Sequence, residues 1–288
     1  MKIRNKLLIS TFIAISFGIA SPAFSQDISI NPDYKAGQIG GLDDKSSQIR
    51  LDDLIENTPI QKEDEDEEEE DKLRLPALQD AAIAYGSRNG LAWATNEINK
   101  IINEEADKLT KAFNFEALLI KTDDNIVILP PVISEAKDTW ESQNEGKSLR
   151  IADTYYEIIK DEKFTYVTPE WSNYLLRTYS KPSLPANSLL PKNEKEKEMW
   201  DRYVTEGWFM GIKQSLEQYK VDLRRLVRDF EGMARYKSLL ARNMVKPPEV
   251  QSGSLGNTGG GDTMRINDKS IDITRDSELN TNSSEWNY

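Results

Sequence analysis

The stretch EKEKEMWDRYVTEGWFMGIKQSLEQYKVDLRRLVRDFEGMARYKSLLARN, residues 194–243, contains no proline and carries apolar residues at a spacing of three or four. This spacing places the apolar side chains on one face of an α-helix. Asn193 is a favourable N-cap residue, and Glu196 follows three residues later, as in a capping box. Pro247-Pro248 would end the helix. The sequence therefore predicts one long helix over residues 194–243.

A second long helix is predicted over residues 76–113, where an apolar stripe has the same spacing. Pro76 suits the first turn of a helix, because its missing N–H needs no partner there. Gly86 and Gly90 interrupt the stripe four residues apart. Polar neighbours such as Arg88 argue against a membrane-embedded glycine pair. We therefore expect these glycines to allow close packing against another element.

Shorter apolar runs around polar turns predict β-hairpins. We expect a hairpin at residues 117–133, a strand pair formed by 149–159 with 164–168, and a hairpin at 263–274 that turns at 267–269. The glycine-rich segment 253–261 is expected to be a flexible loop before the last hairpin, since it lacks the Gly-Lys-Ser/Thr and following helix of a phosphate-binding loop. The predicted fold class is α+β, with two long helices packed against short antiparallel hairpins.

The N-terminus has the pattern of a secretory signal peptide. Three basic residues precede an apolar run at residues 7–20, and Ala23-Phe24-Ser25 supplies small residues at a cleavage site. We expect cleavage between Ser25 and Gln26, so residues 1–25 are assigned to the signal peptide. The alternative is an uncleaved anchor, but the apolar run is shorter than the roughly 20 residues that a membrane-spanning helix needs.

The remaining chain divides by composition into three segments. Residues 26–72 contain few large apolar residues and include nine consecutive acidic residues at 63–71, so we expect a disordered acidic linker. A solvated spacer is favoured there over a calcium site or a contact with a basic partner. Residues 73–275 are expected to form the folded domain, and 276–288 a loose polar tail.

Composition excludes several classes of chemistry. The 288-residue chain has no cysteine and no histidine, so it has no thiol catalysis, thiolate zinc site, Ser-His-Asp triad or histidine metal ligand. Its net charge of −12 disfavours direct binding to nucleic acid or anionic lipid. Neither a catalytic residue nor a cofactor or metal site is predicted.

Two alternatives for function remain in the residues themselves. The six tryptophans would line a glycan cleft or, more simply, pack in the core. Paired carboxylates among the 49 acidic residues would allow glycoside hydrolysis, although chance pairs are abundant at this number. A periplasmic cell-wall glycan-binding module or carboxylate-based hydrolase is therefore one interpretation of the residues, and a soluble, non-enzymatic periplasmic adaptor is another.

A series of short motifs resembles the DotC family of type IVB secretion and IncI-type conjugation systems. The motifs are RLPALQDAA (74–82), YG (85–86), GLAW (90–93), FNF (113–115), LPPV (129–132), SLLPKN (188–193), GW (207–208), LLARNMV (239–245) and GGDTMRIND (260–268). Each motif is short, but they occur in a shared order across the predicted folded domain.

The resemblance implies a non-enzymatic assembly subunit of an outer-membrane core complex. Its expected partners are DotD-like and DotH-like subunits and other copies within a ring, and it would help to place the DotH-type ring at the outer membrane. Such proteins are typically lipoproteins, but this chain has no lipobox cysteine. We therefore expect an exported, periplasmic protein that associates with the outer membrane through protein partners.

Two segments are candidate partner contacts, one in the predicted linker and one in the last predicted hairpin. The first is a candidate because its apolar residues lie at helical spacing. The second is a candidate because its pattern predicts a hairpin that is exposed to solvent. The candidate contact residues are Ile49, Leu51, Leu54, Met264, Arg265, Ile266, Asn267 and Asp268.

Overall fold

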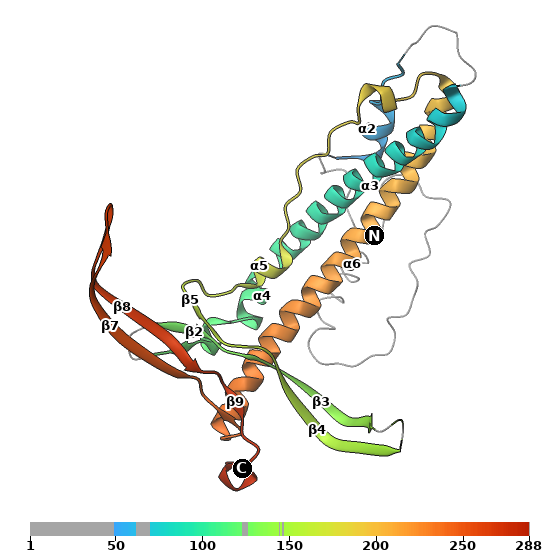
Figure 1. Ribbon diagram of the computed structural model, residues 1–288. Helices are drawn as coiled ribbons and strands as arrows, with labels where there is room; N and C mark the ends of the chain where they lie inside the picture. Colours follow the sequence, from blue (N-terminus) through green and yellow to red (C-terminus); the bar gives the residue numbers. More distant parts are fainter. Residues whose placement is uncertain (1–48, 62–69, 123–125, 144, 146, 288) are drawn as a thin grey trace. The chain divides into compact units, whose positions relative to one another are not determined.

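The computed structural model describes residues 49–61, 70–122, 126–143, 145 and 147–287 (Figure 1). The predicted signal peptide, its predicted cleavage site and most of the predicted acidic linker lie outside these residues. The chain divides into two compact units, Met1–Asp107 with Leu175–Leu223, and Lys108–Tyr174 with Arg224–Tyr288. The mixture of helices and antiparallel strands confirms the predicted α+β class.

The first unit is built on α3 (Glu70–Glu104) and the N-terminal part of α6 (Glu194–Ala241). The prediction for α6 is confirmed to within two residues. The other helix begins earlier than predicted and has Pro76 inside it, and it ends at Glu104. The short α4 (Ala106–Ala112) covers the rest of the predicted range. The break follows a tightened turn, in which the Glu105 N–H bonds to the Ile102 carbonyl.

The Arg74 side chain lies between α3 and the start of α6. Its guanidinium donates hydrogen bonds of 2.6 Å to the carbonyls of Ser188 and Leu190, and it lies 3.3 Å from the Glu196 carboxylate. Glu196 also accepts a bond from the Lys192 N–H at 2.7 Å. One side chain therefore ties α3 to the connector before α6 and to the first turn of α6.

The start of α6 confirms the predicted N-cap. The Asn193 side chain accepts a 2.9 Å hydrogen bond from the Glu196 N–H. The Glu196 carboxylate reaches back to the Lys192 N–H rather than to the cap residue itself. This modified capping box satisfies donors that the helix leaves open at its N-terminus.

Four glycines bring α3 and α6 into backbone contact. A Cβ atom on Gly90 would lie less than 3.0 Å from the Trp208 carbonyl, and a Cβ on Gly211 would lie less than 3.0 Å from the Ser87 carbonyl. The glycines with such a neighbour in the opposite helix are Gly86, Gly90, Gly207 and Gly211. The predicted close packing of the glycine pair is confirmed, and the sequence did not reveal that a second pair on α6 meets it.

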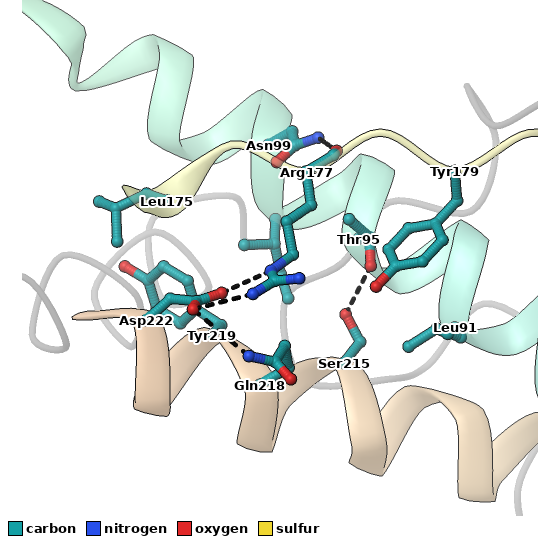
Figure 2. Close-up of a pocket in the computed structure, with 11 residues that line it drawn as sticks. Leu91, Thr95, Asn99, Leu175, Arg177, Tyr179, Ser215, Gln218, Tyr219 and Asp222 are labelled. Atoms are coloured by element: carbon teal, nitrogen blue, oxygen red, sulfur yellow. Dashed lines mark hydrogen bonds and ion pairs between the residues drawn. The ribbon is translucent and has the colours of Figure 1, made fainter. Parts of the chain in front are cut away.

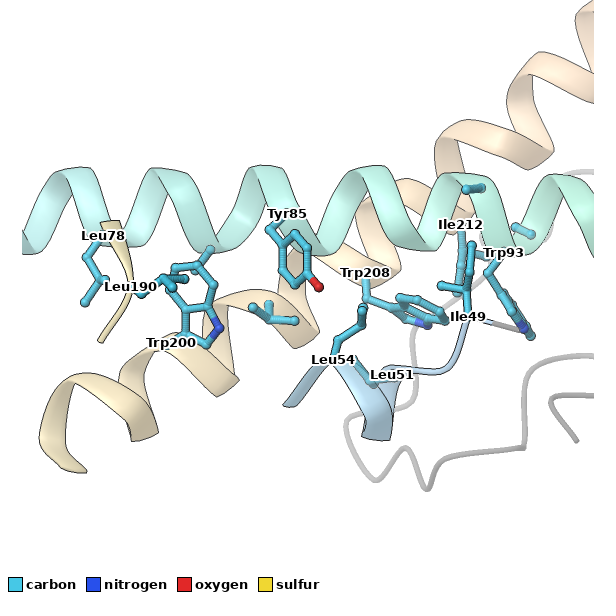
Figure 3. Close-up of a cluster of buried hydrophobic side chains, with 14 residues drawn as sticks. Ile49, Leu51, Leu54, Leu78, Tyr85, Trp93, Leu190, Trp200, Trp208 and Ile212 are labelled. Carbon is cyan, nitrogen blue, oxygen red and sulfur yellow. The ribbon is translucent and has the colours of Figure 1, made fainter. Parts of the chain in front are cut away.

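Large side chains fill the space beside the glycines (Figure 3). Trp200 and Trp208 are fully buried, and the Trp93 and Trp208 rings lie 5.5 Å apart. Tyr85 packs against Trp200 at 6.2 Å between ring centroids. These three tryptophans are core residues, so they form no glycan cleft.

The helix α2 (Leu51–Glu56) belongs to the same core. Ile49, Leu51 and Leu54 are each 5 % exposed and pack in the cluster with Trp208. Lys197 donates a 2.7 Å hydrogen bond to the Ile55 carbonyl. Residues 49–61, which were assigned to the disordered linker, are therefore part of the first unit, because their apolar face covers its core.

The second unit contains most of the strands and the C-terminal part of α6. Its elements are η3 (Glu116–Leu118), β1 (Ile120–Lys121), β2 (Val127–Leu129), β3 (Val132–Gln143), β4 (Ser148–Lys160), β5 (Lys163–Thr165), α5 (Trp171–Leu175), β6 (Val245–Lys246), β7 (Glu249–Gly260), β8 (Thr263–Arg275), β9 (Glu278–Leu279) and η5 (Ser283–Glu285). All pairings are antiparallel, in the orders β1-β2-β5, β3-β4, β6-β9 and β7-β8.

The predicted pairing of 149–159 with 164–168 is wrong. β4 pairs with β3, a strand that the sequence did not reveal, and β5 pairs with β2. Ile128 has no exposure and lies opposite Phe164, which buries an apolar pair that the alternative pairing would separate. The β1–β2 pairing in the predicted hairpin 117–133 is confirmed.

The last hairpin also differs from the prediction. β8 runs without interruption through 267–269, and the turn lies at Gly261-Asp262. The predicted glycine loop 253–261 is largely strand β7. Gly259 and Gly261 have φ of +129° and +62°, which only glycine adopts readily, so they shape the end of the ribbon. Asn267 has φ of +55°, and this local irregularity accounts for its turn-like sequence.

The C-terminal residues are more ordered than the predicted loose tail. Asn280 donates hydrogen bonds from its backbone to the Met244 carbonyl at 2.8 Å and from its side chain to the Asn243 carbonyl at 2.9 Å. The Trp286 indole donates to the Asn280 carbonyl at 2.9 Å. The polar side chains of this C-terminal segment hold it in place by hydrogen bonds to the backbone. A count of apolar residues does not predict such order.

Candidate assembly surfaces

The β3/β4 ribbon is attached to the C-terminal part of α6. Gly232 leaves room for Val132 and Ile133, because a Cβ there would lie less than 3.0 Å from the Val132 side chain. Arg235 donates a 2.6 Å hydrogen bond to the Ile133 carbonyl and forms an ion pair with Glu135 at 3.2 Å. The helix therefore fixes the start of β3 in two ways, by the close approach at Gly232 and by the bonds from the Arg235 side chain.

Asp229 fixes the end of β4. Its carboxylate accepts hydrogen bonds from Lys160 at 2.5 Å and Arg228 at 2.8 Å, and from the Tyr174 hydroxyl at 3.3 Å. Burial alone would raise the pKa of Asp229, but the bonds from Lys160 and Arg228 outweigh burial and hold it below its ordinary value. Burial and the Asp229 charge raise the pKa of Tyr174 to about 12.

The replacement Asp229→Asn should lower the free energy of unfolding by about 2 kcal/mol at pH 7, a figure reduced for the half-exposed Lys160. Because the folded-state pKa is the lower one, the carboxylate stabilises the fold above its unfolded pKa of about 3.8 and loses this effect as pH falls through the folded value. Urea denaturation between pH 7 and pH 3 should show the difference between the two proteins shrinking. A difference that stays constant to pH 3 would contradict this account.

The two faces of the β3/β4 ribbon have different surroundings. Ile133, Tyr156 and Ile158 lie on one face and join the core formed with Tyr236 and Leu239. The other face, which we call the outward face, carries four of the five large apolar side chains that the ribbon exposes: Trp140 (71 %), Ile151 (69 %), Leu149 (58 %) and Tyr155 (49 %). The fifth, Ile159 (38 %), lies at the register shift. Trp140 lies directly opposite Ile151 in the register and Leu149 is the next residue on this face, so these three form an apolar stripe, with Tyr155 beyond Asp153.

The β7/β8 ribbon exposes a second apolar group, Leu255, Met264 and Ile266. Met264 lies opposite Gly259, which has no side chain to cover it. Met264 and Ile266 are two residues apart on β8 and share a face of the ribbon. They are 73 % and 65 % exposed.

The candidate contact residues fall into two groups. Met264, Arg265, Ile266 and Asn267 are exposed, and Asp268, which is half-buried, accepts a hydrogen bond from Thr258. These residues remain available to a partner. In contrast, Ile49, Leu51 and Leu54 are used by the core of the first unit, which covers the surface through which they were expected to bind.

The apolar stripe on the outward face of β3/β4 could not be predicted from the sequence. The residues of β4 alternate between apolar and polar, but alternation alone does not tell which face of a strand the protein covers. Trp140 could not be assigned to the stripe, because the sequence does not identify β3 as a strand.

A small pocket in the first unit lies between α3, α6 and the segment that follows α5 (Figure 2). Arg177 bonds to both carboxylate oxygens of Asp222, at 2.5 and 2.9 Å, and this hydrogen bonding with Asp222 raises the pKa of Arg177. Thr95 and Ser215 bond to each other at 2.9 Å. The volume of about 20 Å³ accommodates a water molecule rather than an organic substrate.

In the part of the chain that the structure describes, no group of three or more acidic residues is placed to hold a metal ion. None of the described helices combines the length and apolar character needed to cross a membrane.

Comparison with known proteins gives a match to one family. No curated protein matches the chain. Residues 72–288 match a family described as type IV secretory system, conjugal DNA-protein transfer (T4SS_TraI). The match covers the second unit and the first unit from residue 72 onward. It confirms the broader part of the expectation drawn from the motifs, namely type IV secretion and conjugation. The chain therefore belongs to the T4SS_TraI family of conjugal type IV secretory systems.

Proposed function

We propose that this protein is a non-enzymatic structural subunit of the envelope core complex of its secretion system. It is exported through the N-terminal signal peptide and held at the outer membrane by DotD-like and DotH-like partners, where it helps to place the DotH-type ring. The family match and the order of the DotC-like motifs support this role.

The observation that carries the proposal is the pair of ribbons with apolar residues on their surface. Each ribbon has only two strands, and a two-stranded ribbon gains little stability without packing on a face. Each nevertheless exposes large apolar side chains, which are costly to leave in water and typical of a protein-binding surface. A subunit that completes its packing within an assembly has this property.

The double replacement Met264→Ser and Ile266→Ser should lower conjugal transfer about tenfold or more, because it removes two apolar contacts from a docking arm without disturbing the core. Transfer frequency, together with affinity purification from detergent-solubilised envelopes, measures this effect. The matched control is Met210→Ser with Val221→Ser, two apolar residues on α6 that are each 48 % exposed. Recovery of the wild-type protein without any secretion subunit would overturn the proposed function.

A further inference from the structure

The outward face of β3/β4 carries charges of only one sign. From Ile133 to Gln143, even-numbered residues of β3 share this face with odd-numbered residues of β4, as Trp140 and Ile151 do. The charged residues at these positions are Asp138, Asp153 and Glu157, and all three are exposed. Beyond the register shift at Val132, neither strand places a lysine or arginine on this face; Lys160, which lies opposite Val132 at the base of the ribbon, is bound to Asp229.

Two of the three basic residues of the two strands lie on the opposite face. Lys137 pairs with Thr154, and Arg150 pairs with Glu141, on the face away from the apolar stripe. Lys160 is bound to Asp229. The two strands contain both acidic and basic residues. The outward face is acidic because the basic residues lie on the other face or at the base of the ribbon.

We infer that the outward face of β3/β4 binds a different protein, one that presents aliphatic or aromatic side chains flanked by lysine or arginine. The inference rests on the proposed function in treating the ribbon as a docking arm. An apolar stripe binds best to apolar side chains of a partner. The three carboxylates around the stripe favour partner residues that are positively charged. Phosphate groups of nucleic acid or of anionic lipid would meet the same carboxylates with repulsion.

A second copy of this chain fits the face less well. It would bring an excess of acidic residues, 49 against 37 basic ones, and its own outward face carries the same sign of charge. Like charges brought together at an interface oppose association, so the complementary surface belongs to another protein.

Photocrosslinking tests the inference with the full chain in cells that carry the complete secretion system. The probe is p-benzoylphenylalanine at position 151, on the outward face, with the same probe at position 154, exposed on the opposite face, as the control. We expect an adduct to another protein from position 151 and none from position 154. The linked partner peptide should contain more lysine and arginine than aspartate and glutamate.

Charge neutralisation supplies the second measurement. Asp138→Asn, Asp153→Asn and Glu157→Gln together should lower the adduct yield from position 151 about tenfold, by removing three weak exposed ion pairs. Asparagine suits position 138, where φ is +50°. The control has the same net charge and alters three exposed carboxylates elsewhere in the second unit, Glu141→Gln, Glu231→Gln and Asp262→Asn.

The outcomes separate the inference from the proposed function. An adduct to a second copy, to lipid or to an acidic peptide, the absence of an adduct, or a yield that falls equally in the control would each overturn the inference. A secretion subunit captured without charge dependence would support the proposed function and overturn the inference. A basic, charge-dependent partner from outside the secretion system would do the reverse.

Discussion

Replacing Gly90 by alanine is expected to lower the free energy of unfolding of the first unit by about 3 kcal/mol or more, and its melting temperature by roughly 10 °C. The added Cβ would lie less than 3.0 Å from the carbonyl oxygen of Trp208, and its carbonyl carbon and Cα are also within about that distance. Backbone cannot rotate away as a side chain can, so α3 and α6 would have to separate. Separation would also loosen the packing between Trp93 and Trp208.

Gly253→Ala is the matched control, because a Cβ at that position meets nothing within 4 Å. Urea denaturation followed by tryptophan fluorescence reports mainly on the first unit, which holds three of the four buried tryptophans. If Gly90→Ala unfolded at the same urea concentration as Gly253→Ala, the contact between the helix backbones would not constrain the fold as described.

Replacing Arg74 by alanine should be the next most damaging single change, at about 3 kcal/mol. The side chain is largely buried and bonds to two carbonyls and to Glu196, whose side chain is 5 % exposed. Its loss leaves a buried carboxylate without its cation and two carbonyls without a donor. Arg74→Lys should restore part of the loss, since one ammonium group cannot reproduce the fork of a guanidinium.

The control for this change is Arg88→Ala, an exposed arginine on the same helix. Urea denaturation gives the stability, and limited proteolysis of the connector at residues 180–191 shows whether the segment that holds Ser188 and Leu190 has been released. Rapid cleavage in the Arg74 variant alone is the expected result, whereas equal cleavage in both variants would contradict the clamp.

The parts of the fold that depend on nearby residues could be predicted from the sequence. The spacing of apolar residues and the Asn193 cap defined α6 almost to its ends, because helix hydrogen bonds join residues four apart. The packing role of Gly86 and Gly90 also followed from the residues between them. What the pattern lacked was the identity of the opposing surface, a second glycine pair more than 100 positions away.

The strand pairings depended on distant residues and could not be predicted. Phe164 lies opposite Ile128, and no local signal favours it over the nearer alternative. β3 has polar residues on both faces, so its sequence VISEAKDTWESQ lacks the alternation that would mark a strand. Without β3, the outward face could not be predicted either, because its apolar stripe depends on the pairing of Trp140 with Ile151.

The candidate contacts divided for a physical reason. Apolar residues at helical spacing indicate that a segment will be covered, but not whether the cover comes from a partner or from the same chain. Ile49, Leu51 and Leu54 are covered by the first unit itself. Met264 and Ile266 stay exposed, and the residue opposite Met264, Gly259, has no side chain to cover it.

The two ribbons have a consequence for the life of the protein before assembly. Each strand of a two-stranded ribbon has one edge whose N–H and C=O groups have no neighbouring strand. Such edges invite pairing with any extended chain, and apolar side chains beside them strengthen the attraction. A surplus copy is thus the form most prone to aggregation and to surveillance by envelope proteases and chaperones, so the amount of this subunit that a cell retains should follow the supply of the proteins that cover its ribbons.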